Sequence, residues 1–366
     1  MKADQPGPAR LSRSKRLLFS LVLLVGVPIG TFIVIEGGSS LLLLARDLTL
    51  HDDVLTERRH TDYDSLLGWV NRPNFYDPNL YGPGVYLRTN AERFRNDRDV
   101  APEPPPGRTR VICSGDSFTL GYGVDNAHTW CSRLEAHDPR LETVNMGQGG
   151  YGIDQAFLWY RRDGRRLGQA AHVLAIITDD FYRTKRRTFL GFGKPLLVLD
   201  GDSLRVTNVP VPRWSYRFPR LATWLNAKRP VMAQLRAAEL YARLAPRFSR
   251  HDTPAVDSDS LNWLVARRIL AELAATDRDE HCTLLVVYLP LAGDRSDTDS
   301  DRWRARLDAA AASDGYQFLD LVPRLRAMAF DSVAPLYIPP GKLGHGHLSA
   351  AGHDWVAREV ARAIFR

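Results

Sequence analysis

Between residues 110 and 123 the chain passes directly from an apolar run into a turn that carries a serine (RVICSGDSFTLGYG). Residues 111–113 are a short apolar run, typical of a buried strand. The run breaks at Ser114-Gly115, so Asp116 and Ser117 follow the strand's carboxyl end, where ligands bind in open α/β sheets. A serine there becomes a nucleophile only if a base takes its proton and N–H groups receive the oxyanion. The stretch therefore predicts an α/β domain and calls for a histidine and a second glycine-rich turn.

Both features are present further along the chain. Asn145–Gly150 (NMGQGG) follows another strand-like run, and Gly346–His353 (GHLSAAGH) lies near the C-terminus. Taken in order, GDSFT, NMGQGG and GHLSAAGH resemble the SGNH/GDSL hydrolase superfamily, especially its membrane-anchored bacterial members linked to surface-polysaccharide acylation. The resemblance extends over residues 63–366 and includes the string TNAERFRND at 89–97. It implies an α/β, flavodoxin-like three-layer sandwich with a central parallel sheet.

The resemblance also implies roles for individual residues. Ser117 corresponds to the nucleophile, His347 to the base, and Gly150 to the oxyanion-hole glycine whose N–H acts together with that of Ser117. Ser117 is also a candidate helix N-cap, and the two roles are compatible because a helix N-terminus favours a developing negative charge. Gly147 is then expected to shape the turn, and His345 is the alternative base.

The third block of the family departs from the usual pattern. Residues 177–181 (ITDDF) place Asp179 where the family has an asparagine whose amide donates to the oxyanion. An ionised carboxylate only accepts hydrogen bonds and would repel an oxyanion. Three explanations stay open: Asp179 is held protonated, Thr178 or Asp180 has another task, or this donor is absent.

The acid that orients the base is a second departure. The family has an aspartate two or three residues before the base, but Gly344 and His345 occupy those positions here. His347 then works in a Ser–His dyad, or its ring is oriented by a backbone carbonyl or by a distant carboxylate such as Asp320. His353 is expected to face elsewhere on the last helix and to pack or meet solvent.

The N-terminus carries the signature of a membrane anchor. Residues 1–16 have a net charge of +4, and Leu17–Ile35 are nineteen residues without a charge. That length suits a bilayer span, and the positive flank predicts a cytoplasmic N-terminus. The apolar stretch is prolonged to Ala45, which favours a signal anchor over residues 17–45 rather than a cleaved signal peptide. We expect a single-pass inner (cytoplasmic) membrane protein with its catalytic domain in the periplasm or outside the cell.

The remaining chain is predicted to have two parts. An extracytoplasmic lead-in with little regular structure covers residues 46–107, and an SGNH hydrolase-like domain covers 108–366. Strand-like and helix-like segments alternate in this domain, which indicates a parallel sheet with helices on both faces. An insertion, 181–260, contains a predicted β-hairpin with Asp200-Gly201 at its turn. The hairpin holds a second GDSL string, but its Ser203 is not followed by a helix N-terminus and is assigned to the hairpin alone.

Strands are expected at 110–113, 142–146, 172–178, 282–289 and 316–321, and helices at 129–137, 153–167, 260–275, 301–313 and 349–365. The insertion also carries Trp214, Tyr216, Trp224 and Tyr241. These aromatic residues are expected to pack the insertion onto the core, with capping of the site or stacking on sugars as alternatives.

Charge and cysteine usage exclude several other classes of function. The formal charge of +7 includes the +4 of the first sixteen residues, so the rest of the chain carries little net charge to attract nucleic acid. Cys113, Cys131 and Cys282 lack metal-ligand spacing and are expected to be buried core residues, with a disulfide open in an oxidising compartment. The glycine-rich strings match no nucleotide fingerprint. We predict no metal, no cofactor and no nucleic-acid partner.

Together these features predict a serine esterase or O-acyltransferase. It would act on acyl esters of cell-surface carbohydrate, with acetyl as the expected group, through an acyl-serine intermediate. Transfer to water or to a sugar hydroxyl both stay open, and a membrane acyltransferase is a candidate partner. The alternative, motivated by Asp179 and the missing acid, is a catalytically degenerate protein that binds glycan or scaffolds a polysaccharide-modifying complex. A lipase or thioesterase is a third hypothesis.

Overall fold

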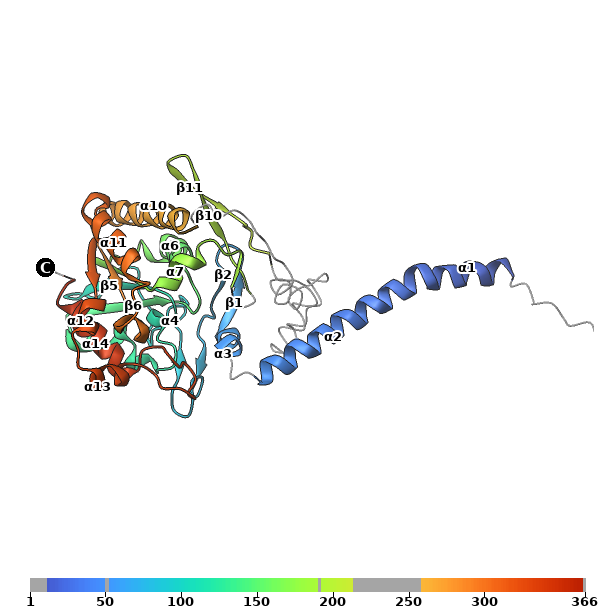
Figure 1. The fold of residues 1–366 in the computed structure, drawn as a ribbon, viewed down its shortest axis with the longest axis horizontal. Coiled ribbons are helices and arrows are strands. Elements are labelled where there is room, and N and C mark those ends of the chain that lie inside the picture. Colours follow the sequence, from blue (N-terminus) through green and yellow to red (C-terminus); the bar gives the residue numbers. More distant parts are fainter. Residues whose placement is uncertain (1–11, 50–52, 190–191, 213–257, 365–366) are drawn as a thin grey trace, which may run out of the picture. The chain divides into compact units, whose positions relative to one another are not determined.

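The computed structural model describes residues 12–49, 53–189, 192–212 and 258–364, which belong to two compact units. The N-terminal unit contains a helical stretch made of α1 (Arg13–Leu21), a π-helical turn η1 (Val22–Gly26) and α2 (Val27–Thr49) (Figure 1). As the sequence predicts, its segment Arg13–Ser39 is long and apolar enough to cross a membrane. A retained anchor and a cleavable signal sequence share these properties.

The second unit is built on a parallel sheet. Its described strands are β5 (Thr109–Gly115), β6 (Leu141–Gly147), β7 (Ala171–Ile176), β12 (Thr283–Tyr288) and β13 (Gln317–Asp320). They lie in the order β13-β12-β7-β5-β6, with every pair parallel. This is the flavodoxin-like order of doubly wound folds, in which ligands bind where the order reverses, here between β5 and β7. The predicted α/β sandwich with a central parallel sheet is confirmed.

Helices cover both faces of this sheet (Figure 1). One face is covered by α6 (Ile153–Trp159), α10 (Ser258–Asp279) and α11 (Asp301–Asp314), and the other by α5 (Trp130–His137) and α14 (Ala350–Ala361). Side chains alternate along β5, so Ile112 belongs to the first core while Val111 and Cys113 belong to the second. Because both faces are buried, the inner strands β7 and β12 carry apolar residues on both sides rather than alternating with polar ones.

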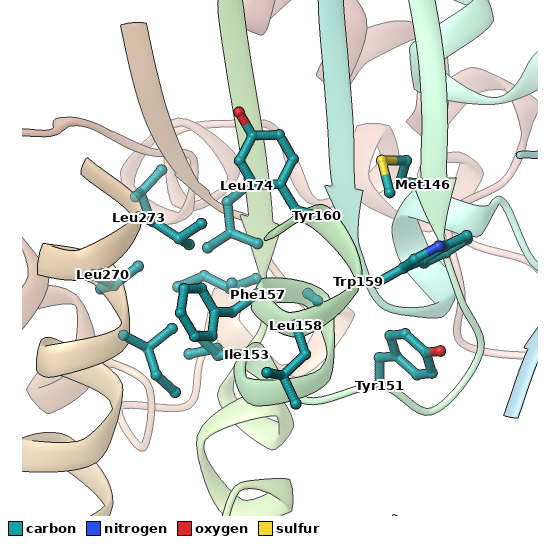
Figure 2. Close-up of a cluster of buried hydrophobic side chains, with 14 of the residues drawn as sticks. Met146, Tyr151, Ile153, Phe157, Leu158, Trp159, Tyr160, Leu174, Leu270 and Leu273 are labelled. Carbon is teal, nitrogen blue, oxygen red and sulfur yellow. The ribbon is translucent and has the colours of Figure 1, made fainter. Parts of the chain in front are cut away.

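Figure 2 shows the first core, where Phe157 of α6 lies toward Leu270 and Leu273 of α10. The predicted helix 153–167 is in fact α6 followed by a π-helical turn, η3 (Tyr160–Gly164). Other short elements are α4 (Ser117–Leu120), η2 (Asn126–His128), α7 (Thr178–Arg183), η5 (Ala292–Arg295), α12 (Val322–Arg326), α13 (Phe330–Val333) and η6 (Ala334–Leu336).

The strand predicted over 172–178 ends early. It stops at Ile176, and α7 begins at Thr178. The carboxylate of Asp180 accepts the N–H of Ile177 at 3.0 Å and so satisfies a backbone donor at the start of α7. A capping side chain therefore ends the strand within an otherwise apolar run.

The lead-in has more regular structure than the sequence suggests, and that prediction is wrong. It contains α3 (Asp53–His60), the antiparallel pair β1 (Thr61–Asp64) and β2 (Gly68–Asn71), and the pair β3 (Tyr76–Asp77) and β4 (Leu87–Arg88). Its Trp69, Phe94 and Arg95 side chains are buried in the second unit. These elements are too short to show a period, and long-range contacts stabilise them.

The insertion is described in part. It contains β8 (Thr188–Phe189), β9 (Phe192–Gly193), β10 (Leu196–Asp200) and β11 (Ser203–Thr207). The β10–β11 hairpin is confirmed, with its turn at Gly201-Asp202, one residue later than predicted. Ser203 pairs with Asp200 and is exposed, so the second GDSL string is a hairpin. Trp214, Tyr216, Trp224 and Tyr241 lie outside the described residues.

The cysteines differ in state. Cys113 of β5 and Cys131 of α5 form a disulfide, and Cys282 is a buried thiol. Burial raises the pKa of the Cys282 thiol, so it stays protonated. The disulfide joins β5 to α5, a helix on the second face of the sheet.

Candidate active site

Ser117 lies where β5 ends and α4 begins, at the switch point of the sheet. Asp116 caps α4, with its Oδ1 accepting the Phe118 N–H at 2.8 Å. Ser117 is the first helical residue, so its own N–H has no partner within the helix. The residue is 8% exposed. This turn therefore presents a hydroxyl and a backbone N–H at a helix N-terminus, where negative charge is favoured.

The structure brings His347 to Ser117 from the other end of the chain. The His347 Nε2 lies 2.9 Å from Ser117 Oγ, and its Nδ1 lies 3.2 Å from the Gly344 carbonyl oxygen. With the proton on Nδ1 donated to that carbonyl, Nε2 is left to accept the serine proton. The imidazole is packed between the Phe118 and Tyr122 rings, at centroid distances of 4.8 and 5.1 Å. Hydrogen bonds to Ser117 and Gly344 and contacts with two aromatic rings hold the imidazole in this orientation.

Of the orienting groups that the sequence leaves open for His347, the structure shows a backbone carbonyl beside Nδ1 and not the Asp320 carboxylate. Asp320 ends β13 at the sheet edge, where its carboxylate accepts from Arg304 and from the Val322 N–H. It is engaged there instead of with His347, because β12 and β7 separate its strand from β5. The Gly344 carbonyl takes the position of the orienting group. A neutral carbonyl orients the imidazole but stabilises the imidazolium less than a carboxylate does.

The other two histidines near the C-terminus do not contact the serine. His345 is exposed, and its backbone N–H donates to the Lys342 carbonyl oxygen. His353 is buried, and its Nδ1 accepts the Trp130 N–H at 3.2 Å. Burial, together with nearby positive charge, lowers the pKa of His353 to about 3. His353 therefore packs, as the sequence predicts.

The second glycine-rich turn meets the serine turn. A Cβ at Gly147 would overlap the Leu120 backbone nitrogen, so only glycine lets β6 approach α4 this closely. The Asn145 side chain joins the two turns, because its Oδ1 accepts the Gly147 N–H at 2.9 Å and its Nδ2 donates to the Thr119 carbonyl at 2.9 Å. Gly150 follows with φ of 76°, a left-handed conformation that favours glycine.

The lead-in supports the glycine-rich turn from behind, which the sequence analysis missed. The Trp69 indole Nε1 donates to the Gly149 carbonyl at 2.9 Å, and the Tyr151 hydroxyl donates to the Trp69 carbonyl. The Gln148 amide donates to the buried Glu57 carboxylate of α3. Two elements of the lead-in, α3 and β2, therefore hold this turn in place.

The lead-in also holds the loop that follows α4. Arg95 is buried and donates to the carbonyls of Leu120 and Gly121, both at 2.6 Å, and its Nε donates to Asn126 at 2.8 Å. Arg95 belongs to the string TNAERFRND, so the resemblance in that segment was the one available signal. The lead-in is therefore part of the site and not a passive spacer.

The structure places Asp179 at the surface. Its side chain is 62% exposed, and Oδ2 lies 3.8 Å from Arg183 Nη2. Thr178 and Asp180 do have other tasks, which was one of the three explanations. Thr178 bonds the Tyr288 hydroxyl, and Asp180 pairs with Arg183 at 2.7 Å. Burial and the neighbouring carboxylates raise the pKa of Asp180 well above its usual value.

A second serine–histidine–aspartate array lies inside the first core and was not expected from the sequence. Ser114 Oγ is 2.6 Å from His172 Nε2, and His172 Nδ1 is 2.9 Å from Asp277 Oδ2. Tyr160 stacks on the His172 ring at 3.7 Å and donates to Asp277. Ser114 is 1% exposed and the other two triad members are fully buried. A substrate cannot reach the Ser114 hydroxyl. We therefore assign this array a structural role and not a catalytic one.

Among the described residues, no group of three or more His, Cys, Asp or Glu side chains is placed to hold a metal ion. The groups that the structure places at the site are the Ser117 hydroxyl, the His347 imidazole and backbone N–H groups.

No protein-family model and no curated protein matches this sequence. Several solved structures are similar to the chain. The acetyl xylan esterase AlAXEase is 13% identical, over 70% of this chain and 100% of that one, with a TM-score of 0.40. A member of the G-D-S-L lipolytic family from Veillonella parvula DSM 2008 is 12% identical, over 70% and 99%, with a TM-score of 0.39. A variant of an acetyl-xylooligosaccharide esterase from Geobacillus is 13% identical, over 71% and 96%, with a TM-score of 0.39. These likenesses are distant, and what the site does is inferred from its own geometry.

Proposed function

We propose that the protein is an SGNH-type serine esterase or O-acyltransferase with Ser117 as nucleophile and His347 as base. The observation that carries the proposal is the 2.9 Å distance between Ser117 Oγ and His347 Nε2 at the switch point of the sheet. This is the nucleophile–base geometry that activates a hydroxyl for attack on an ester. The N–H groups of Ser117 and Gly150 are the proposed oxyanion donors.

The reaction follows from these positions. His347 Nε2 takes the Ser117 proton while Oγ attacks the ester carbonyl carbon, and the carbonyl electrons move onto the oxyanion. As the intermediate collapses, the carbon–oxygen bond to the alcohol breaks and the imidazolium returns its proton to that leaving oxygen. An acyl-serine remains. Water, or a sugar hydroxyl, then attacks it by the same steps in reverse, which restores Ser117.

The substrate class is proposed from location and resemblance. The helical stretch α1–α2 would hold the protein in the inner membrane, with its catalytic domain in the periplasm or outside the cell. The Cys113–Cys131 disulfide fits an oxidising compartment. A catalytic domain at that location would encounter acyl esters of surface carbohydrate, and acetyl is the expected acyl group. A membrane acyltransferase is the proposed acyl-donating partner.

A second candidate function is a degenerate member that binds glycan or scaffolds a modifying complex. Two observations favour it: the exposed Asp179 carboxylate where an amide donor is expected, and a neutral carbonyl behind His347. The two candidates differ in whether the Ser117 hydroxyl is needed.

Hydrolysis of p-nitrophenyl acetate by the full-length protein, with and without an acetyl-accepting oligosaccharide, tests the proposal. Ser117→Ala and His347→Ala are expected to abolish turnover, whereas Ser203→Ala, in the second GDSL string, is a matched control that should keep it. Acetylated sugar among the products would identify a transferase, and acetate alone an esterase. Equal rates for the wild type and Ser117→Ala would leave only the binding function.

A further inference from the structure

Arg183, the last residue of α7, joins the two turns that frame the site. Its guanidinium Nη1 lies 3.0 Å from Asp116 Oδ2, 2.8 Å from the Tyr151 carbonyl oxygen and 2.7 Å from Asp180 Oδ1. The side chain is 9% exposed, and the Asp116 and Asp180 carboxylates are buried. One nitrogen therefore bonds the residue before Ser117 and the residue after Gly150.

That arrangement sets the spacing of the proposed oxyanion donors. The Ser117 N–H belongs to the peptide unit that begins at Asp116, and Tyr151 directly follows Gly150. Because Nη1 contacts Asp116 and Tyr151 together, neither turn shifts without breaking a buried, charge-assisted hydrogen bond. Oxyanion donors act only within a few tenths of an ångström of the correct position, so the link matters for chemistry.

Asp116 also places a negative charge beside the serine. Ser117 Oγ lies 3.5 Å from Asp116 Oδ2, so this carboxylate faces both the serine proton and the oxyanion that would form beside it. Arg183 engages the same oxygen, Oδ2, and so leaves the serine proton to His347. It also places a positive charge among the Asp116, Asp179 and Asp180 carboxylates.

Among the described residues, Arg183 is the cation that contacts Asp116, and no other positively charged side chain does so. Phe189 covers the guanidinium at 4.8 Å, and the nearby buried Lys194 is paired with Asp154. Removal of Arg183 would therefore expose the forming oxyanion to uncompensated negative charge.

We propose that Arg183 is the positioning residue of the oxyanion hole, holding the Ser117 and Gly150 turns at a fixed distance and neutralising Asp116. The inference rests on the proposed esterase or acyltransferase function. It assigns a role in the rate of the chemical step to a side chain outside the strings GDSFT, NMGQGG, ITDDF and GHLSAAGH.

The test compares Arg183→Met with Arg186→Met in the full-length protein. Arg186 is exposed and also lies over Phe189, at 5.7 Å, so it is a matched loss of an arginine. With p-nitrophenyl acetate, Arg183→Met is expected to lower kcat by about 10²–10³-fold, the cost of one oxyanion donor, with KM within twofold. The acid limb of the kcat/KM profile should move to higher pH, because uncovered carboxylates favour the His347 imidazolium. Arg186→Met should match the wild type.

Arg183→Lys keeps the charge with a different donor geometry and covers the case in which Arg183→Met does not fold. It is expected to keep the acid limb in place and to lose roughly tenfold in kcat, part of the cost of a misplaced donor. A wild-type kcat in either variant overturns the inference, as does a loss of kcat that leaves the acid limb of a folded Arg183→Met unmoved. A wild-type protein without Ser117-dependent turnover would instead refute the proposed function, so the two failures are distinguishable.

Discussion

Replacing Trp69 by phenylalanine removes one hydrogen bond from the support of the glycine-rich turn and little else. The indole Nε1 donates to the Gly149 carbonyl at 2.9 Å, while the ring stacks on Phe192 and meets Tyr151 edge-on. A phenyl ring keeps most of those ring contacts. The variant therefore tests whether the lead-in positions the Gly150 N–H or only packs beneath it.

The expected losses of stability and of kcat follow from the contacts that the substitution removes. A buried carbonyl left without its donor costs about 1–3 kcal/mol, and the volume lost between indole and phenyl adds roughly 1 kcal/mol. Stability is thus expected to fall by about 2–4 kcal/mol. Loss of a whole oxyanion donor costs about 10²–10³-fold in kcat, so a displaced Gly150 N–H is expected to cost roughly tenfold.

Trp159→Phe is the matched control. Trp159 is fully buried and also meets Tyr151, but its Nε1 donates to the Asp163 carboxylate rather than to the turn. Both variants should show a similar loss of stability in urea unfolding. Under conditions in which both are fully folded, only Trp69→Phe should have a lower kcat toward p-nitrophenyl acetate. Equal kcat values for the two variants would refute a positioning role for the lead-in.

Three further predictions concern stability and are checked by urea unfolding. Because burial depresses the pKa of His353 to about 3, the unfolded chain binds a proton that the folded chain excludes, so stability should fall as pH drops from about 6.5 toward 3, by about 1.4 kcal/mol per unit. His353→Asn should flatten that slope, and identical slopes would contradict the assignment. The double variant Cys113→Ala/Cys131→Ala, which opens a link between residues 18 apart, should lose about 3 kcal/mol relative to the oxidised wild type; an unchanged midpoint would speak against the disulfide. Asp154→Asn leaves the buried Lys194 ammonium without its partner and should cost about 3–5 kcal/mol, while Asp154→Leu/Lys194→Met should cost less. A loss below about 1 kcal/mol in the single variant would show that the pair is not needed.

The proposed site residues are the ones whose sequence signals are local. Ser117 follows an apolar run at a turn, and His347 and Gly150 lie in short strings that resemble known ones. The parallel sheet was predictable for the same reason, since β5, β7 and β12 each contain a largely apolar run. The β10–β11 hairpin was predictable from its turn residues, apart from a shift of one position.

The supporting residues could not be predicted, because their partners lie far along the chain. Trp69 and Gly149 are 80 residues apart, and Arg183 and Asp116 are 67 apart. A side chain that donates to a backbone carbonyl leaves no periodicity and requires no particular residue type in its partner. The buried hydrogen bond between Ser114 and His172 could not be predicted from the sequence for the same reason.

Reaction with a serine-directed fluorophosphonate, followed by mass-spectrometric mapping of the adduct on the full-length protein, tests the central claim most directly. The account predicts a single adduct on Ser117, lost in His347→Ala and retained in Ser203→Ala, with Ser114 unmodified in the folded protein. A folded protein that forms no adduct at Ser117, or that is modified at another serine, would contradict it.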